Sequence, residues 1–555
     1  MPDRLLLDNA PSNLKDNPHY QLVHAVHAQQ TSFEQLINTL MPFINGTQTL
    51  TPDLALPLST ALLEIERTSI AQDQLMNLVN DLAAPSLALS EAGQILSLNL
   101  GATQLFHVET GDGLRALGID QQAFLNLKQR LRQVQGPTLV RAKNFQLPAE
   151  LPFILIATWN EQAQSIILSA LQHHWPQSID HAMKSLFGLS SSECEILSAL
   201  AQGQTSEQIA AQRQRAITTV RQQIKSILQK LDVHTQVQAA TLAAAAVHAS
   251  GGSRPHHSPM ISNDHPLYIH HFYRKQRVIG WRRFGQAEGQ PVLFIHGPSF
   301  GAGEYEQDRI HAVQQGLDIY AIERPGYGRT SPPEHGEDIL ECQYQDLIAF
   351  LEQQSLKQVT LFAHEVGLIA ALQLAVRHPE RIKAVLAVSA APPFLELEQL
   401  HRMPDHQAVF IQAARHTPWL ARLMIRLMLA QTRRLGPEHW TDVIFQGVEQ
   451  DMQVMLNPAL KPGIIATYSF YLNQMGHGFE LDLQMMLKDW TGLLQLLERP
   501  LVLIHGSKNA TTPVDTLSIF QQLQPAIQLE VIEQAGLTLA VSHTELIYQR
   551  LAEMA

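Results

Sequence analysis

Between residues 18 and 80, leucine and isoleucine recur at intervals of three and four residues. This spacing places apolar side chains on one face of a helix and therefore predicts helical structure. Pro52 and Pro57 interrupt the tract. Because a proline inside a helix removes a backbone hydrogen bond, we expect at least two helices. We assign residues 1–71 to an N-terminal helical segment.

A different pattern follows, in which short apolar runs alternate with turns. Residues 83–106 predict a strand, a tight turn at Ser90–Gly93, a second strand and a helix. Three further apolar runs between residues 138 and 170 predict strands. Two early strands, central helices and three closing strands predict a small antiparallel sheet within residues 72–175.

The C-terminal half, residues 267–555, alternates apolar strands with helices, which is typical of a parallel sheet with crossover helices. Residues 249–266 are rich in Gly, Ser, Pro and His and predict a linker. A mostly helical insertion, residues 395–495, carries many methionines and aromatic residues, among them Phe410 and Phe479. The fold class is therefore multidomain, with α+β and α/β parts.

Composition narrows the function classes. The chain has 555 residues, which at roughly 100–200 residues per domain suggests about three or four domains. Its net charge of −12 argues against nucleic-acid binding by the whole surface, but not against one local basic helix. Its two distant cysteines suggest no metal site, and we expect no cofactor. We find no signal peptide and no run of 18 apolar residues, so we expect a cytoplasmic protein without membrane contact.

Residues 189–233 predict three helices in close succession. Gly203 is placed to end the first, and Thr205 or Ser206 can cap the second. A break near residues 215–217 precedes the third helix, near 217–231. Two helices joined by a short turn form a helix-turn-helix, whose second helix enters the major groove of DNA.

Basic residues concentrate in this segment. Between Gln208 and Leu231 there are five basic residues and no acidic one. Phosphate contact requires such a local positive surface. Arginine can pair with guanine, and glutamine with adenine, through two hydrogen bonds. The candidate DNA-binding residues are Thr218, Thr219, Arg221, Gln222, Gln223 and Lys225.

The segment resembles the LuxR-type helix-turn-helix family over its whole length. Arg213 and Arg215 depart from the family pattern, which usually has apolar residues there, so the turn is expected to pack differently. The resemblance implies a domain over residues 182–248 that binds double-stranded DNA as a homodimer, with a fourth helix at 235–247 making the dimer. The alternative is a four-helix unit used only for dimerisation. The matching residues are Leu189, Glu193, Glu195, Ile196, Leu197, Ala201, Gly203, Ile209, Ala210, Thr219, Val220, Ile224, Ile227, Lys230, Leu231 and Val233.

Residues 72–175, with the stretch LALSEAGQILSLN, resemble a PAS domain. The resemblance implies a sensory or dimerising module. No cysteine or histidine stands where flavin or haem would require one. The alternative is a dimerising spacer that binds nothing.

Residues 267–555 resemble the α/β-hydrolase fold in their order of strands and loops. Active members carry a serine at the tip of a G-x-S-x-G elbow, with an acid and a base on later loops. Here the elbow reads Ala-His-Glu-Val-Gly, so the nucleophile position holds Glu365, the acid position Asn509 and the base position Leu537. Leucine cannot accept a proton, and a neutral amide cannot support an imidazolium. The resemblance therefore implies the fold without its catalytic residues. His364 and His543 are interpreted as structural.

We interpret this half as a retired enzyme that keeps its pocket as a sensor. The elbow amide and the amide after His296-Gly297 would form an anion-binding nook. The Glu365 carboxylate would either occupy the nook or contact a donor on a ligand; alternatively, it only fills space. The candidate ligand-binding residues are Gly297, Pro298, Glu365, Val366, Asn509 and Leu537.

Together these patterns predict a dimeric DNA-binding transcription regulator whose catalytically inactive hydrolase-fold domain senses a small, largely apolar ligand. Two alternatives stay open. One is a bifunctional regulator with residual hydrolase activity at an atypical Glu365 site. The other is a regulator whose hydrolase-fold domain is a protein-interaction scaffold.

Overall fold

The computed structural model divides the chain into two compact units. One unit combines residues 1–73 with residues 263–555, and the other comprises residues 74–262. The boundary falls inside helix α5 (Pro52–Asp81), which contributes residues to both units. The structure describes residues 17–27, 32–49, 51–82, 84–108, 110–134, 137–142, 153–161, 164–170, 177–201, 204–251, 269–394, 397–436, 441–442, 444–445 and 448–555.

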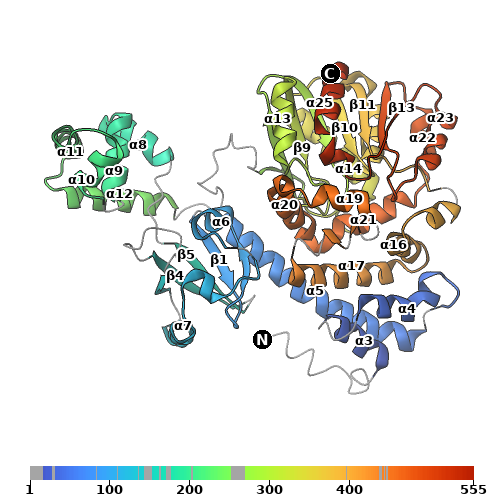
Figure 1. Ribbon diagram of the computed structural model, residues 1–555, viewed down its shortest axis with the longest axis horizontal. Helices are drawn as coiled ribbons and strands as arrows, with labels where there is room; N and C mark the ends of the chain where they lie inside the picture. The colour runs from blue at the N-terminus through green and yellow to red at the C-terminus, as the bar shows by residue number, and fades with distance from the viewer. Residues whose placement is uncertain are drawn as a thin grey trace. The chain divides into compact units, whose positions relative to one another are not determined.

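An eight-stranded sheet organises the C-terminal half (Figure 1). Its strand order is β13-β12-β11-β10-β8-β9-β7-β6, with β6, β7 and β9 joined by antiparallel pairing and the remaining pairs parallel. The central strands are buried along their whole length, as expected for parallel strands covered on both faces. The strands are β6 (His270–Arg274), β7 (Arg277–Gly285), β8 (Gln290–Ile295), β9 (Leu317–Ile322), β10 (Val359–His364), β11 (Ile382–Val388), β12 (Leu501–Gly506) and β13 (Gln528–Ile532).

Helices cover both faces of this sheet, so two separate apolar clusters form. One cluster joins α13 (Glu306–Gln314) and α25 (Thr544–Met554) to the sheet, and the other joins α14 (Ile339–Gln353), α15 (Gly367–Arg377) and α23 (Ser518–Leu523). The fold predicted for this half is therefore observed, with the carboxyl ends of β8, β10, β11 and β12 at one edge of the sheet.

Helices occupy the segment between β11 and β12, and we call them the lid. Most of them bury apolar residues in the same cluster as Phe294 and Val388, whereas Leu494, in the last of them, packs in the other cluster. The lid helices are α16 (Asp405–His416), α17 (Pro418–Leu435), α19 (Glu449–Met455), α20 (Lys461–Leu472), α21 (His477–Met486) and α22 (Thr491–Gln495).

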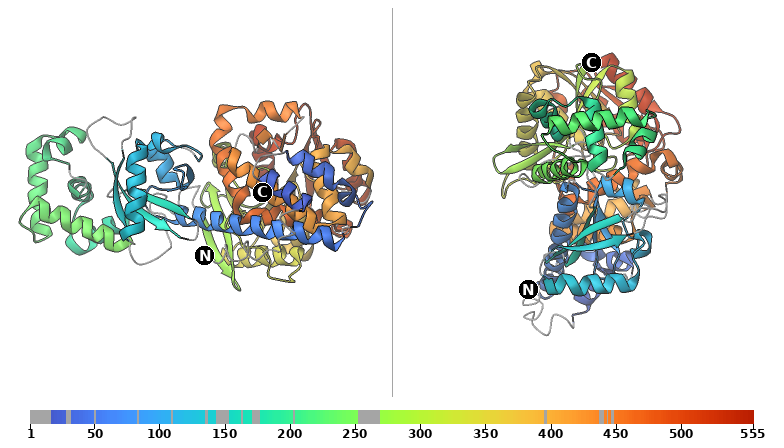
Figure 2. Two further views of the ribbon diagram at one scale, coloured as in Figure 1. Left: turned by 90° about the horizontal axis from the view of Figure 1, so that it is seen from below. Right: turned by 90° about the vertical axis from the view of Figure 1, so that its left-hand side faces the viewer.

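The N-terminal helices pack on this lid (Figure 1, Figure 2). Helices α3 (Pro18–His27) and α4 (Phe33–Ile44) contact α17, and α4 also contacts α16. The ring of Phe33 stacks on that of Phe410 at 6.4 Å between centroids, and the Thr417 hydroxyl donates to the carbonyl of Phe43. The sequence predicted helices here but not their position, and the break expected at Pro57 was wrong, because α5 continues through that residue. They form a second layer over the lid.

The second unit contains a five-stranded antiparallel sheet of order β2-β1-β5-β4-β3. This is the sheet of two early and three late strands that the sequence predicts; the assignment to the PAS family remains a prediction. Buried Asn99 donates to the carbonyls of Val79, Leu82 and Ala84, which fixes the end of α5 against the sheet. The elements are β1 (Ser86–Leu89), β2 (Ile95–Leu98), α6 (Leu100–Phe106), α7 (Gln121–Val134), β3 (Thr138–Ala142), β4 (Phe153–Asn160) and β5 (Ser165–Ala170).

Five helices follow in the same unit and share one apolar cluster. Thr205 caps α10 through a reciprocal pair of hydrogen bonds with Gln208, so the cap is Thr205 rather than Ser206. The predicted helix end at Gly203 lies outside the described residues. The helices are α8 (Gln177–Phe187), α9 (Ser191–Ala201), α10 (Ser206–Gln212), α11 (Ile217–Lys230) and α12 (Gln236–Gly251).

Candidate functional site

The turn after β10 keeps the geometry of a nucleophile elbow. Glu365 at its tip has a φ of 49°, in the left-handed region that side chains other than glycine rarely adopt. A Cβ at Gly367 would lie 2.5 Å from the carbonyl oxygen of Ile295, so only glycine fits there. The backbone strain of the elbow is therefore retained while a carboxyl group stands at the nucleophile position.

The Glu365 side chain is buried and turned toward the loop after β8. Its Oε2 accepts a hydrogen bond from the amide of Ser299 at 3.2 Å and lies against the Cα of Gly297. The amide expected directly after His296-Gly297 does not exist, because that residue is Pro298, which has no N–H. That part of the prediction was wrong. The donor is one residue further along, and the carboxyl group itself occupies the position.

Burial raises the pKa of Glu365 to about 7, because an ionised carboxylate loses hydration there. Hydrogen bonds from Ser299 and the charge of Arg324 act in the opposite direction but do not outweigh burial. Near neutral pH a large share of Glu365 is therefore protonated and able to donate a hydrogen bond.

The neighbouring histidine of the elbow does not take part. The His364 ring lies among the rings of Phe294 and Phe362, each at 4.7 Å between centroids, and burial lowers its pKa to about 3. It is a neutral core residue and does not line the pocket described below.

The acid and base positions carry no proton-transfer groups. Asn509 is buried and accepts from the amide of Thr512 at 3.0 Å, which shapes the loop after β12. The loop of Leu537 is held by Asp451 of α19, whose carboxylate accepts from the amides of Leu537 and Thr538 at 3.2 and 2.8 Å. Helix α19 thus holds the loop that carries Leu537, the residue predicted for the base position.

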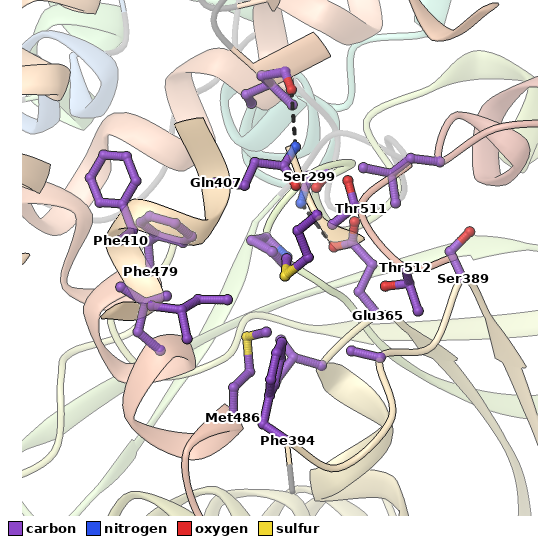
Figure 3. Close-up of a pocket in the computed structure, with 18 of the residues that line it drawn as sticks. Ser299, Glu365, Ser389, Phe394, Gln407, Phe410, Phe479, Met486, Thr511 and Thr512 are labelled. Carbon is purple, nitrogen blue, oxygen red and sulfur yellow. Dashed lines mark hydrogen bonds between the residues drawn. The ribbon is translucent and has the colours of Figure 1, made fainter. Parts of the chain in front are cut away.

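A partly open pocket of about 170 Å³ lies between the elbow, the loop after β12 and the lid (Figure 3). Figure 3 shows Glu365, Ser389 and Thr512 on one side, with Phe410 and Phe479 on the other. Of the predicted ligand-binding residues, the pocket is lined by Pro298, Glu365, Val366 and Leu537, whereas Gly297 and Asn509 support it from behind.

Sequence reasoning missed the polar groups at the ends of two further strands, Ser389 after β11 and Thr511-Thr512 after β12. A signal for them existed, because the carboxyl ends of parallel strands meet at one edge of an open sheet. Polar residues directly after each apolar run were therefore candidates.

A buried ion pair lies near Glu365, which lines the pocket. Arg324 donates to both carboxylate oxygens of Asp482 on α21, at 2.6 Å each, and the Tyr327 hydroxyl donates to the same carboxylate. The amide of Arg324 donates to Nε2 of His296. Arg324, the cation whose charge acts on Glu365, is therefore already paired with the carboxylate of Asp482.

The predicted DNA-binding residues lie on α11, and most are exposed. Thr218, Thr219, Gln222 and Lys225 point to solvent, as does Arg221, which pairs with Glu207 at 3.0 Å. Gln223 differs, because its Nε2 donates to the hydroxyl of Ser192 on α9 at 2.9 Å and the residue is half-buried. These contacts favour a role for Gln223 in holding α11 against α9.

Arg213 explains how the turn accommodates its departure from the LuxR pattern. Its guanidinium donates to the carbonyl and the hydroxyl of Ser192 at 2.9 Å each, and pairs with Glu195 at 2.9 Å. An arginine thus joins α9 to the end of α10 at a position where the family usually has an apolar residue. Among the described residues, no cluster of ligating side chains suited to a metal ion occurs.

Comparison with known families identifies both domains. Residues 188–243 match the bacterial regulatory proteins of the luxR family, and residues 290–539 match the alpha/beta hydrolase fold. The chain therefore carries a LuxR-type helix-turn-helix domain and an α/β-hydrolase-fold domain. Among the helices of the described residues, none is both long and apolar enough to cross a membrane.

The hydrolase-fold half is similar to several curated enzymes, and its sequence identity to them is low. A 2-hydroxymuconate semialdehyde hydrolase of Pseudomonas putida is 23% identical over 268 residues, which span 47% of this chain and 85% of the hydrolase. A non-heme chloroperoxidase of Streptomyces lividans is 27% identical over 118 residues, which span 21% of this chain and 42% of that protein. The solved bromoperoxidase from Bacillus anthracis is 19% identical, with a TM-score of 0.40, over 52% of this chain and 99% of that one.

Proposed function

We propose that this protein is a ligand-responsive transcription regulator that binds double-stranded DNA as a homodimer. Its hydrolase-fold domain binds a small, largely apolar molecule without hydrolysing it. The observation that carries the proposal is the elbow carboxyl group, hydrogen-bonded to Ser299 and facing a mostly apolar pocket that is also lined by Leu537, the residue predicted at the base position. The same chain contains the luxR-family domain. The proposal includes a cytoplasmic location, because the partner is DNA.

The absence of catalysis follows from the side chains at the three catalytic positions. A carboxylate nucleophile would form an ester, and an activated water would then be needed to release it. Leu537 cannot activate water, and Asp451 is occupied with the amides of the same loop. The pocket therefore supports binding better than turnover.

Helices α16 and α17 provide the proposed route from pocket to DNA-binding domain. Both line the pocket, through Phe410 and Met428 among others, and both contact the N-terminal helices. Helix α5 continues from these contacts to Leu75 and Val79, which pack on the five-stranded sheet. A ligand that binds one arrangement of the lid more tightly would shift the population of DNA-competent molecules.

The test of ligand binding uses the full-length protein and an organic extract of the host culture. Fractions are added during thermal unfolding, and wild type is compared with Leu483→Trp, which fills the pocket from α21. Leu546→Trp, on the exposed side of α25, is the matched control. We expect a fraction that raises the Tm of wild type and of the control but not of Leu483→Trp. A Tm that rises equally in all three would contradict binding in this pocket.

A further inference from the structure

The geometry points to the chemical class of the ligand. We propose that it is an uncharged, elongated molecule with a carbonyl head group, such as an ester, ketone or amide, and an apolar tail. The head would lie between Glu365 and Ser389, and the tail under α16, α17 and α21. This inference rests on the proposed function and assigns the recognition chemistry of its pocket.

The head-group position is defined by two neighbouring strand ends. His364 pairs with Val388 across β10 and β11, so Glu365 and Ser389 follow side by side, and both line the pocket. The Ser389 side chain is only 2% exposed, and its Oγ has no hydrogen-bond partner among the described residues. A buried hydroxyl without a partner is costly, and a ligand oxygen placed there would remove that cost.

Glu365 supplies the second donor. Its Oε2 accepts from the amide of Ser299, the Ser299 side chain also acts on the carboxyl group, and Glu365 lines the pocket. Because burial raises the pKa of this group to about 7, its protonated form can donate to a ligand oxygen at and below neutral pH. Two donors at neighbouring strand ends, both lining the pocket, suit a carbonyl oxygen, which has two lone pairs.

The remainder of the pocket is mostly apolar. Phe410, Met428, Phe479 and Met486 contribute its lid side. Methionine adapts to irregular ligand shapes, and aromatic rings bury large areas. The volume of about 170 Å³ is many times the roughly 10–15 Å³ that one water-sized position needs, so the pocket has room for a head group and an alkyl chain.

The charges around the floor disfavour an ionised head group. Asp482 holds Arg324 through both carboxylate oxygens, so this cation is not available for a carboxylate ligand. Across the pocket, burial lowers the pKa of His406, which keeps that ring neutral. A buried carboxylate without a partner is strongly disfavoured.

The pH dependence of head-group binding follows from Glu365, because the groups that surround it do not titrate near neutrality. The pKa of Arg324 is raised by Asp482 and that of Tyr471 by burial, while burial holds the pKa values of His296 and His364 well below their usual range. A carbonyl ligand accepts from the protonated form. Its affinity should therefore fall as the pH rises through 7.

The test compares three probes of equal chain length, namely methyl decanoate, decanoate and decylamine, by isothermal titration calorimetry on the full-length protein. We expect methyl decanoate to bind most tightly at pH 6, and its affinity to fall on the order of tenfold by pH 8 as Glu365 loses its proton. Glu365→Gln, whose amide still donates, should bind methyl decanoate with an affinity that does not change over this range. Ser389→Ala should weaken binding severalfold, whereas Ser518→Ala, an exposed serine outside the pocket lining, should not.

Three outcomes separate the inference from the function on which it rests. Tighter binding of decylamine, strengthening from pH 6 to pH 8, would overturn the carbonyl assignment and leave a sensor of amines. Tighter binding of decanoate would overturn the charge argument in the same way. If none of the probes binds a protein that still gains Tm from a culture fraction, the assigned class is wrong while the sensor function stands.

Discussion

Glu66 of the N-terminal helix α5 forms an ion pair with Arg426 of the lid helix α17, 3.3 Å from Oε1 to Nε and 360 residues later in the chain. The Arg426 side chain is fully buried and also pairs with Glu480 of α21 at 3.1 Å. Arg422 adds a second bond to Glu66 at 2.7 Å. Three helices from two distant segments are thus joined by charge, next to pocket residues of α17 and α21.

Removing Glu66 should weaken the attachment of the N-terminal helices. We expect Glu66→Ala to lower the free energy of unfolding of this unit by about 1.5–3 kcal/mol, because a buried guanidinium loses a charged hydrogen-bond partner. Urea unfolding followed by circular dichroism measures the change. Glu352→Ala, an exposed glutamate on α14, is the matched control. Equal stability of the two variants would show that the pair contributes nothing to this packing.

Glu365→Gln should alter stability in a pH-dependent way. The pKa of Glu365 is about 7 when folded, against 4.5 for the unpaired group, so its stabilising effect is complete below about pH 4.5 and is lost as the pH rises through 7. The variant should equal wild type near pH 5 and exceed it by up to about 3 kcal/mol at pH 8. Comparing the two by chemical unfolding at each pH isolates this residue, and a difference that is constant with pH would contradict the account.

Ester hydrolysis should stay at the level of the buffer. With Leu537 predicted at the base position and Asn509 at the acid position, no side chain there can activate water to release an acyl intermediate in the usual way. Release of p-nitrophenol from p-nitrophenyl butyrate is the measurement. Turnover above background that disappears in Glu365→Ala would instead support the bifunctional alternative.

The α11 surface should carry the salt-dependent part of DNA binding. Arg221→Ala combined with Lys225→Ala removes two exposed cations and should weaken binding to the upstream region of the protein's own gene. The slope of log affinity against log salt should become shallower by about 0.9 for each phosphate that the variant no longer neutralises. Fluorescence anisotropy at several salt concentrations measures both quantities. Lys357→Ala, an exposed lysine of the hydrolase-fold unit, should leave the slope unchanged.

Local pattern was sufficient for many elements of the chain and for the residues at the tip of the elbow. Helical spacing predicted α11 to within a residue, since the observed element is Ile217–Lys230. Alternating runs predicted the five-stranded sheet and the parallel strands of the larger one, but not its antiparallel edge of β6 and β7. Glu365 could be identified because the elbow requires small residues on either side of its tip.

Contacts between distant segments could not be predicted in the same way. Nothing in the residues around Glu66 indicates that its partner is Arg426, because the pairing arises only when the N-terminal helices pack on the lid. The inward position of Gln223 likewise depends on Ser192, 31 residues earlier. Whether Gln223 contacts a DNA base or forms an internal hydrogen bond depends on tertiary packing, which helical spacing alone does not encode.

The most direct test of the central claim measures DNA affinity as a function of pocket occupancy. Full-length wild type and Leu483→Trp are titrated onto the upstream DNA by fluorescence anisotropy, with and without the culture fraction that raises the Tm of wild type. We expect the fraction to shift the midpoint for wild type and to leave that of Leu483→Trp unchanged, although both proteins bind DNA. An identical midpoint for wild type with and without the fraction, under conditions where its Tm rises, would contradict the claim that the pocket controls DNA binding.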